Sequence, residues 1–192
     1  MARRRGLDRD DVLTAALAIV DDEGLDALSL RAVADALGVQ APSLYSHVEG
    51  LPGLLDALSI RVTSEFGEVL RDSVVGVAGD DAVAAFATAY RRWATDHPGR
   101  YELTLRPVTV AEKRTVGRSA IETMDRVLAA YGLTGAEATA AGRTLRAALH
   151  GFSTLEAADA LGRGDHDQSF RYLVALFLDG IRAGERGTPI SA

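Results

Sequence analysis

Apolar residues recur every three or four positions through most of this 192-residue chain. Near the N-terminus, Val12, Ala16, Ile19 and Val20 form one such stripe. This period places apolar side chains on one face of a helix, whereas a half-buried strand needs strict alternation. Alternating runs of β-branched residues are rare, and alanine and leucine are abundant. The sequence therefore predicts an all-α protein.

Helix-capping residues and glycines divide this pattern into about nine helices. A first helix is expected between Asp8 and Gly24, a second from Ser29 to the residue before Gly38, and a third over about 41–47. Pro42 lies in the first turn of the third helix, where a missing N–H has no cost. Further helices are predicted over about 51–74, 81–96, 110–131, 135–161 and 167–183, with a short turn after Pro98 and frayed residues from 184 onward. We expect two domains, residues 1–50 and 51–192.

The segment 29–48, SLRAVADALGVQAPSLYSHV, predicts a helix-turn-helix. Two short helices are joined by a tight corner at Gly38, a residue that readily adopts a left-handed conformation. Ala34 is small where the helices cross, and Val33, Leu37, Val39 and Leu44 are expected to point inward and hold the crossing angle. In such a motif the second helix enters the DNA major groove. A plain helical hairpin is the alternative that this pattern leaves open.

Composition excludes several classes of protein. The chain has 47% apolar and 25% charged residues, as globular domains do, and no cysteine, so disulfides and thiolate chemistry are absent. No apolar run approaches the roughly 18 residues of a membrane span, and the basic N-terminus lacks the apolar stretch of a secretory signal. We expect a cytoplasmic protein with no membrane association.

The usual signatures of catalytic sites are also missing from the sequence. It contains no Gly-x-Ser-x-Gly, no glycine-rich phosphate loop and no His-Glu-x-x-His. Asp165, His166 and Asp167 superficially resemble a metal-ligand cluster, but adjacent residues cannot easily face one ion, so a loop or a helix cap is expected. We expect no enzyme, no cofactor and no bound metal.

About fifty consecutive residues resemble the DNA-binding domain of TetR-family transcriptional regulators. The matching residues are Gly24-Leu25, Leu28-Ser29-Leu30-Arg31, Val33-Ala34, Leu37-Gly38-Val39, Pro42-Ser43-Leu44-Tyr45-Ser46-His47-Val48 and Leu54-Leu55-Asp56-Ala57-Leu58. The resemblance implies a three-helix DNA-binding domain over 1–50, followed by a helical ligand-binding and dimerisation domain over 51–192. This second domain would begin with a linker helix over about 51–74.

The resemblance and side-chain chemistry together suggest which residues contact DNA. Gln40 opens the recognition helix and can donate to and accept from base edges, whereas Ala41 offers only a methyl group, so base specificity should rest on its neighbours. Hydroxyl and imidazole groups further along suit phosphate oxygens. For Tyr45 and His47, packing against the first helix is the alternative. The residues expected at DNA are Arg3, Arg4, Arg5, Arg31, Gln40, Ala41, Pro42, Ser43, Tyr45, Ser46 and His47.

The chain carries a net charge of −6, so it can bind DNA only if its acidic residues lie away from the DNA-contacting surface. Residues 1–50 contain five arginines and nine acids, yet residues 39–48 contain no acid. Arg3, Arg4 and Arg5 would form an arm able to reach phosphates or a narrow minor groove. Many family members have a lysine where Leu51-Pro52 stands here, and Glu49 lies beside it. Few phosphate contacts are therefore expected, with modest and salt-sensitive binding.

Residues 81–183 resemble the ligand-binding region of one subgroup of the family. The resemblance rests on Tyr90-Arg91-Arg92-Trp93-Ala94, His97-Pro98-Gly99-Arg100-Tyr101, Leu149-His150-Gly151-Phe152 and Ser169-Phe170. It implies a sensor of an unidentified small molecule, in a pocket between the linker helix and the helices at 81–96 and 110–131. The residues expected to line the pocket are Phe86, Tyr90, Trp93, Tyr101, Met124, Leu128 and His150, each of which could equally be core or, for the histidine, a hydrogen-bonded structural residue.

The last two predicted helices are candidates for a homodimer interface. The segment 137–161 is rich in alanine and glycine, so another helix can approach it closely. The last helix carries an apolar stripe at helical spacing, made of Phe170, Val174, Phe177, Leu178 and Ile181. Two such helices from each copy would form a four-helix interface under two-fold symmetry. The alternative is that both stripes belong to the core of one chain.

The expected mechanism is a shift between two dimer geometries. An effector would favour the geometry in which the recognition helices are wrongly spaced for consecutive major grooves, and a palindromic operator would be released. Activation or corepressor dependence occurs in some family members. The alternative function is a helical adaptor that binds only protein, which an acidic N-terminal unit would suit.

Overall fold

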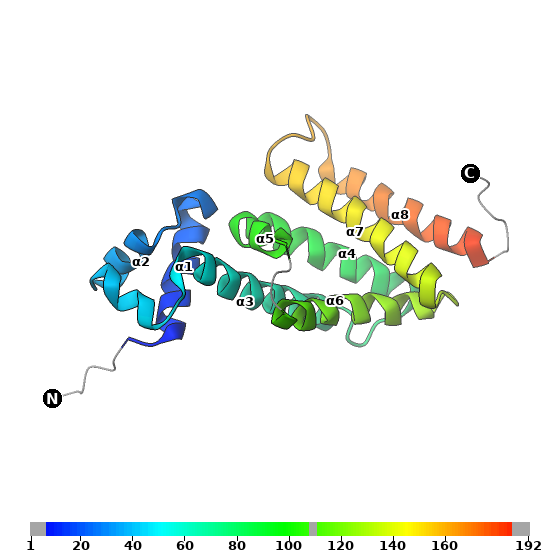
Figure 1. Cartoon of the computed structure of the whole chain (residues 1–192). Helices are drawn as coiled ribbons and strands as arrows, with labels where there is room; N and C mark the ends of the chain where they lie inside the picture. Colours follow the sequence, from blue (N-terminus) through cyan, green and yellow to red (C-terminus); the bar gives the residue numbers. More distant parts are fainter. Residues whose placement is uncertain (1–6, 108–110, 186–192) are drawn as a thin grey trace. The chain divides into compact units, whose positions relative to one another are not determined.

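The computed structural model describes residues 7–107 and 111–185 and is all-α over them, which confirms the predicted fold class (Figure 1). Eight α-helices and two short 3-10 helices form this described part. In chain order they are α1 (Arg9–Glu23), η1 (Leu25–Ala27), α2 (Leu30–Leu37), η2 (Ala41–Ser46), α3 (Gly50–Ser73), α4 (Gly79–Asp96), α5 (Pro98–Leu105), α6 (Ala111–Ala129), α7 (Gly135–Ala157) and α8 (His166–Glu185). None of these helices is both long and apolar enough to cross a bilayer.

The chain divides into two compact units. Among the described residues, the first unit consists of 7–64, 97–107 and 111–116, and the second consists of 65–96 and 117–185. Helices α3 and α6 therefore contribute residues to both units. These compact units do not test the predicted boundary between a DNA-binding and a ligand-binding domain after residue 50, which stays a prediction.

Helix α1 of the first unit begins and ends as its sequence predicts. The Asp8 carboxylate accepts a hydrogen bond from the Asp11 N–H at 2.9 Å, and the Asp8 N–H donates to the Asp11 carboxylate at 3.0 Å. This reciprocal pair satisfies two N–H groups at the start of the helix. The apolar stripe is buried, with Val12, Ala16 and Val20 at its centre. Its partners include α2, η1 and α5.

Helix α5 is longer than the short turn predicted after Pro98. It packs on α1 so closely that a Cβ added to Gly99 would lie 2.6 Å from the Val20 carbonyl oxygen. Arg100 closes the contact with two hydrogen bonds to the Asp21 carboxylate, at 2.7 and 2.6 Å. Ser59 of α3 donates to the Leu103 carbonyl at 2.7 Å. These long-range contacts stabilise a short segment whose proline and glycine predict little helix by themselves.

The core of the second unit forms where α7 and α8 pack against α4. Leu145 and Leu149 of α7 are fully buried, and Phe66 stacks on Trp93 with a centroid distance of 4.5 Å. At the other end of α4, Asp80 accepts a hydrogen bond from the Tyr131 hydroxyl at 2.7 Å and forms an ion pair with Arg182. The apolar core of the second unit therefore ends, at this end of α4, in polar contacts between helices.

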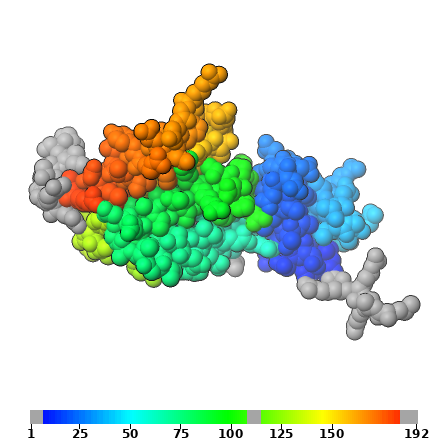
Figure 2. Space-filling view, turned by 180° about the vertical axis from the view of Figure 1, so that it is seen from behind, coloured from blue at the N-terminus to red at the C-terminus, as the bar shows by residue number. Residues whose placement is uncertain are grey.

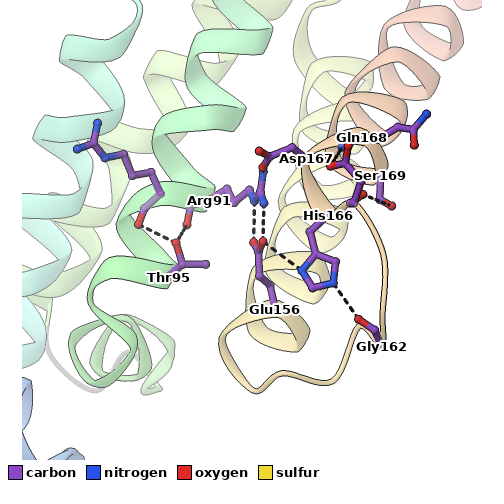
Figure 3. Close-up of polar contacts among 10 residues, drawn as sticks. Arg91, Thr95, Glu156, Gly162, His166, Asp167, Gln168 and Ser169 are labelled. Carbon is purple, nitrogen blue, oxygen red and sulfur yellow. Dashed lines mark hydrogen bonds and ion pairs between the residues drawn. The ribbon is translucent and has the colours of Figure 1, made fainter.

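Arg91 of α4 joins the end of α7 to the start of α8 (Figure 3). Its guanidinium donates through Nε to Glu156 at 2.6 Å, through a second nitrogen to the same carboxylate, and through Nη1 to Asp167 at 2.8 Å. It also lies over the Phe170 and Phe152 rings, 4.8 and 5.3 Å from their centroids. The hydrogen bond with Glu156 is the main reason that the pKa of Arg91 is raised above its ordinary value. The guanidinium therefore stays charged and holds three helices together.

The acidic and histidine residues at the start of α8 have structural partners. The Asp165 carboxylate accepts from the Gln168 N–H at 2.8 Å, as a helix cap does, and Asp167 binds Arg91. A His166 ring nitrogen lies 3.0 Å from the Gly162 carbonyl oxygen (Figure 3). Within residues 7–107 and 111–185, no group of three or more metal-ligating side chains is brought together. The cap predicted at this position is present.

Candidate functional site

The corner between α2 and η2 is built as the sequence predicts. Ser29 caps α2 by accepting a hydrogen bond from the Ala32 N–H at 3.1 Å. After Leu37 the chain turns at Gly38, whose φ of 65° and ψ of 33° lie in the left-handed region. Only glycine adopts this conformation at little cost. The Val39 N–H then donates to the Ala34 carbonyl at 3.0 Å and closes the end of the helix.

The segment after the corner is a 3-10 helix rather than an α-helix. It covers Ala41–Ser46, one residue short of the predicted end, and hydrogen bonds such as Ser43 N–H to Gln40 carbonyl at 2.9 Å close its turns. Its inner side is held by Leu44, which is fully buried, and by Val48, which is buried just beyond its end. Val33 and Ala34 of α2 are buried as well, while Leu37 and Val39 are half-buried. The predicted inward-facing residues therefore anchor the motif.

The outer side of η2 presents neutral polar groups. Tyr45 exposes 63% of its surface, so it does not pack against α1 in the way that the alternative required. His47 and Ala41 are half-buried. Ser46 donates its hydroxyl proton to the Ser43 carbonyl at 2.8 Å and keeps its lone pairs available. The exposed members of the predicted DNA-contacting set on this side are Gln40, Pro42, Ser43, Tyr45 and Ser46.

Among the predicted DNA-contacting cations, only Arg31 falls within the described residues. It stands on the exposed side of α2, and its Nε lies 3.8 Å from the Asp35 carboxylate one turn later. Arg3, Arg4 and Arg5 lie outside the described residues. The roles of all these residues at DNA stay predictions.

The residues predicted to line an effector pocket are mostly buried. Six of them expose less than a tenth of their surface, and His150 is half-buried, 3.4 Å from the Thr154 hydroxyl. Phe86, Tyr90 and Trp93 share one side of α4, and Gly142 of α7 lies against Met124 and Leu128 of α6. Tyr101 belongs to the first unit, whereas the other six belong to the second. Burial fits both a pocket wall and ordinary core, so the assignment stays a prediction.

Two buried residues of the second unit, Phe66 and Ser153, were not identified from the sequence. Phe66 contacts both Tyr90 and Trp93, and it continues the helical spacing of Val62 and Leu70 along α3, which is a signal that could have identified it. Ser153 of α7 is buried, and its hydroxyl has no hydrogen-bond partner within the described part of the chain. A buried hydroxyl is costly to leave unpaired. No sequence signal distinguishes Ser153 from the many serines that bond to their own helix.

The apolar stripe predicted as an interface on α8 instead belongs mainly to the core of the chain. Four of its five members, Phe170, Val174, Leu178 and Ile181, are buried, and Phe177 is half-buried. Helix α8, orange to red in Figure 2, lies at the surface of the single chain. Its exposed side carries Tyr172 and Leu176. On α7, Ala140, Ala147, Ala157 and Leu155 are exposed. An apolar stripe at helical spacing does not by itself show whether that side of the helix faces the core of the chain or a second copy.

Comparison with known proteins identifies both parts of the chain. Residues 12–57 match the family model described as "Bacterial regulatory proteins, tetR family", and residues 83–177 match "Tetracyclin repressor-like, C-terminal domain". An uncharacterized HTH-type transcriptional regulator of Mycobacterium tuberculosis is 38% identical over 94% of this chain and 84% of its own length. The uncharacterized HTH-type regulator YobS of Bacillus subtilis is 35% identical over 94% and 96%.

One similar protein has been solved in complex with DNA. The crystal structure of BioQ with its double-stranded DNA operator superposes with a TM-score of 0.68 and 26% identity, over 93% of this chain and 99% of that one.

Proposed function

This chain belongs to the TetR family of helix-turn-helix transcriptional regulators, and we propose from this premise that it is a repressor. It binds a palindromic operator as a homodimer, and a small-molecule effector releases it. The observation that carries the proposal is the outer side of η2, which is exposed, free of acids and anchored from beneath by Leu44. BioQ, a relative of similar length, was solved on its operator.

The chemistry of that surface suits recognition by neutral groups. Gln40 stands at the N-terminal end of η2, where side chains of a recognition helix reach base edges, and a glutamine amide can pair with adenine. The hydroxyls of Ser43 and Tyr45 suit phosphate oxygens, which position the protein without reading sequence. With no lysine or arginine in η2, affinity depends on Arg31 and on charges elsewhere.

Changing Tyr45 to alanine should weaken binding to operator DNA about tenfold, since a hydrogen bond to a charged phosphate is worth about 1.5–3 kcal/mol. The melting temperature should stay unchanged, because the side chain is largely exposed. Fluorescence anisotropy with a duplex selected by the wild-type chain from a random pool measures the affinity. Val75→Ala, which trims an exposed residue between α3 and α4, is the matched control. Equal affinities of Tyr45→Ala and wild type would contradict the proposal that η2 contacts DNA.

The proposed dimer interface is the uncovered side of α7 and α8. It combines large apolar groups, Leu155, Tyr172 and Leu176, with small residues such as Gly151 and Gly180, beside which an added Cβ would meet nothing within 4 Å. Small residues let helices approach closely, and a two-fold axis pairs the same patch on both copies. Two copies are also what a palindrome requires.

A charged residue within this patch should separate the copies. Leu176→Arg is expected to give monomers in sedimentation velocity at concentrations where the wild type is dimeric, because an unpaired charge would be buried between the copies. Ile121→Arg on α6 is the matched control, since Ile121 is 57% and Leu176 54% exposed. A dimer that survives Leu176→Arg but not Ile121→Arg would assign the interface to α6 instead.

The proposed effector site lies among the buried aromatic residues of the second unit. Phe66, Tyr90 and Trp93 offer flat apolar surface, and Ser153 offers a hydroxyl that no described residue satisfies. Such a combination suits an apolar molecule with one hydrogen-bonding group. Trp93 is the only tryptophan of the chain, so its fluorescence reports binding directly. An effector is a compound that changes this fluorescence and also releases DNA.

A further inference from the structure

The exposed side of α2 carries two opposite charges one helical turn apart. Arg31 exposes 90% of its side chain and Asp35 exposes 74%, and the guanidinium Nε lies 3.8 Å from the carboxylate. This separation is an ion-pair distance rather than a strong hydrogen bond. Arg31 is the only lysine or arginine in the 30–46 segment that contains α2 and η2, and Asp35 is its only acid. The charge balance of the motif therefore depends on this one pair.

Helix α2 is the element that meets the DNA backbone when a helix-turn-helix docks, because the first helix crosses the phosphates while the second enters the groove. Arg31 is then the cation that α2 can offer to a phosphate. Asp35, one turn away, attracts the same guanidinium. The carboxylate and the DNA phosphate compete for one side chain.

We propose that Asp35 is a positioning residue that limits the affinity of this chain for DNA by holding Arg31. The inference rests on the proposed DNA binding through α2 and η2. Asp35 lowers affinity for duplexes of any sequence, since phosphate contacts carry no sequence information. Release by an effector then has less binding energy to overcome.

The size of the pair's interaction makes such an exchange feasible. An exposed pair at positions i and i+4 is weak, and salt screens it. A phosphate can therefore displace Asp35 from Arg31 at a small cost in free energy. This cost lowers the affinity of the chain for every DNA duplex. Freeing Arg31 should strengthen binding about twofold. The gain should be largest at low salt, because salt screens the Arg31–Asp35 pair, so the slope of log affinity against log salt becomes steeper.

The test measures fluorescence anisotropy of the full-length chain with the selected duplex and with a scrambled duplex, over a range of salt concentrations. Asp35→Asn should bind both duplexes about twofold more tightly at low salt, with the steeper salt slope. Asp35→Glu, which keeps a carboxylate within reach, should behave like wild type. Asp26→Asn in η1 removes an equal charge from an exposed residue and should change neither quantity. In the Arg31→Gln background, Asp35→Asn should have no effect.

Three outcomes would overturn the inference. One is equal affinity of Asp35→Asn and Asp26→Asn. Another is a gain that persists without Arg31, which would mean that Asp35 repels phosphates directly. The third is a gain with no change in salt slope. If the wild-type chain binds neither duplex at low salt, the proposed function itself fails, whereas DNA binding that is insensitive to Asp35 contradicts only this inference.

Discussion

Leu44→Ala is expected to lower the free energy of unfolding by about 2–5 kcal/mol and to abolish DNA binding. Leu44 is fully buried, and it is the only residue of η2 that points into the core. A six-residue 3-10 helix has little stability of its own, so its position depends on this side chain and on Val48 beyond its end. Without the Leu44 side chain, the exposed side of η2 is no longer held in one position for contact with DNA.

The neighbouring residue supplies the matched comparison. Tyr45→Ala changes the very next position of η2 but should leave stability unchanged while weakening DNA binding. Urea unfolding followed by circular dichroism, together with anisotropy, separates the two effects. If Leu44→Ala bound DNA as wild type does, η2 would not be held from beneath by this residue, and the described anchoring would be wrong.

Arg91→Ala is expected to lower the free energy of unfolding by about 2–4 kcal/mol, because removal of one partner leaves a partly buried charge uncompensated. Arg91 exposes only 17% of its side chain, as does Glu156, so solvent screens their interaction little. The substitution also removes the stacking on Phe152 and Phe170. Arg91→Lys should recover part of the loss, since lysine keeps the charge but not the two-pronged geometry.

Arg92→Ala is the control for Arg91. Arg92 is the next residue of α4, exposes 82% of its side chain and pairs with Asp96 at 3.4 Å. Exposed pairs are worth about 0–1 kcal/mol, so its loss should change the melting temperature little. Thermal unfolding of the three variants at low and high salt is the measurement. Equal losses for Arg91→Ala and Arg92→Ala would mean that the contacts with Glu156 and Asp167 do not stabilise the second unit.

Local sequence signals account for most of the helix-turn-helix. Ser29 and Gly38 bound α2 because capping and left-handed turns depend on the residue itself. The inward position of Leu44 follows from the same short spacing. The 3-10 geometry of η2 was not predicted, since both kinds of helix suit a short segment with a proline in its first turn.

Features that depend on distant residues were missed. Arg91 lies 65 positions from Glu156 and 76 from Asp167, and no local pattern connects them. Helix α5 forms against α1, so the sequence around Pro98 predicts only a turn. On α8, two apolar sides exist, and the choice of Phe170 over Tyr172 for the core depends on how α4 and α7 pack.

Hydroxyl-radical footprinting of the selected duplex tests the central claim most directly. Two copies of η2 in adjacent major grooves should protect two patches about 34–36 Å apart, or about 10–10.5 base pairs, placed symmetrically about the centre of a palindrome. The effector should remove both patches together. A single patch, or no protection at low salt, would contradict a dimeric repressor that reads paired half-sites through η2.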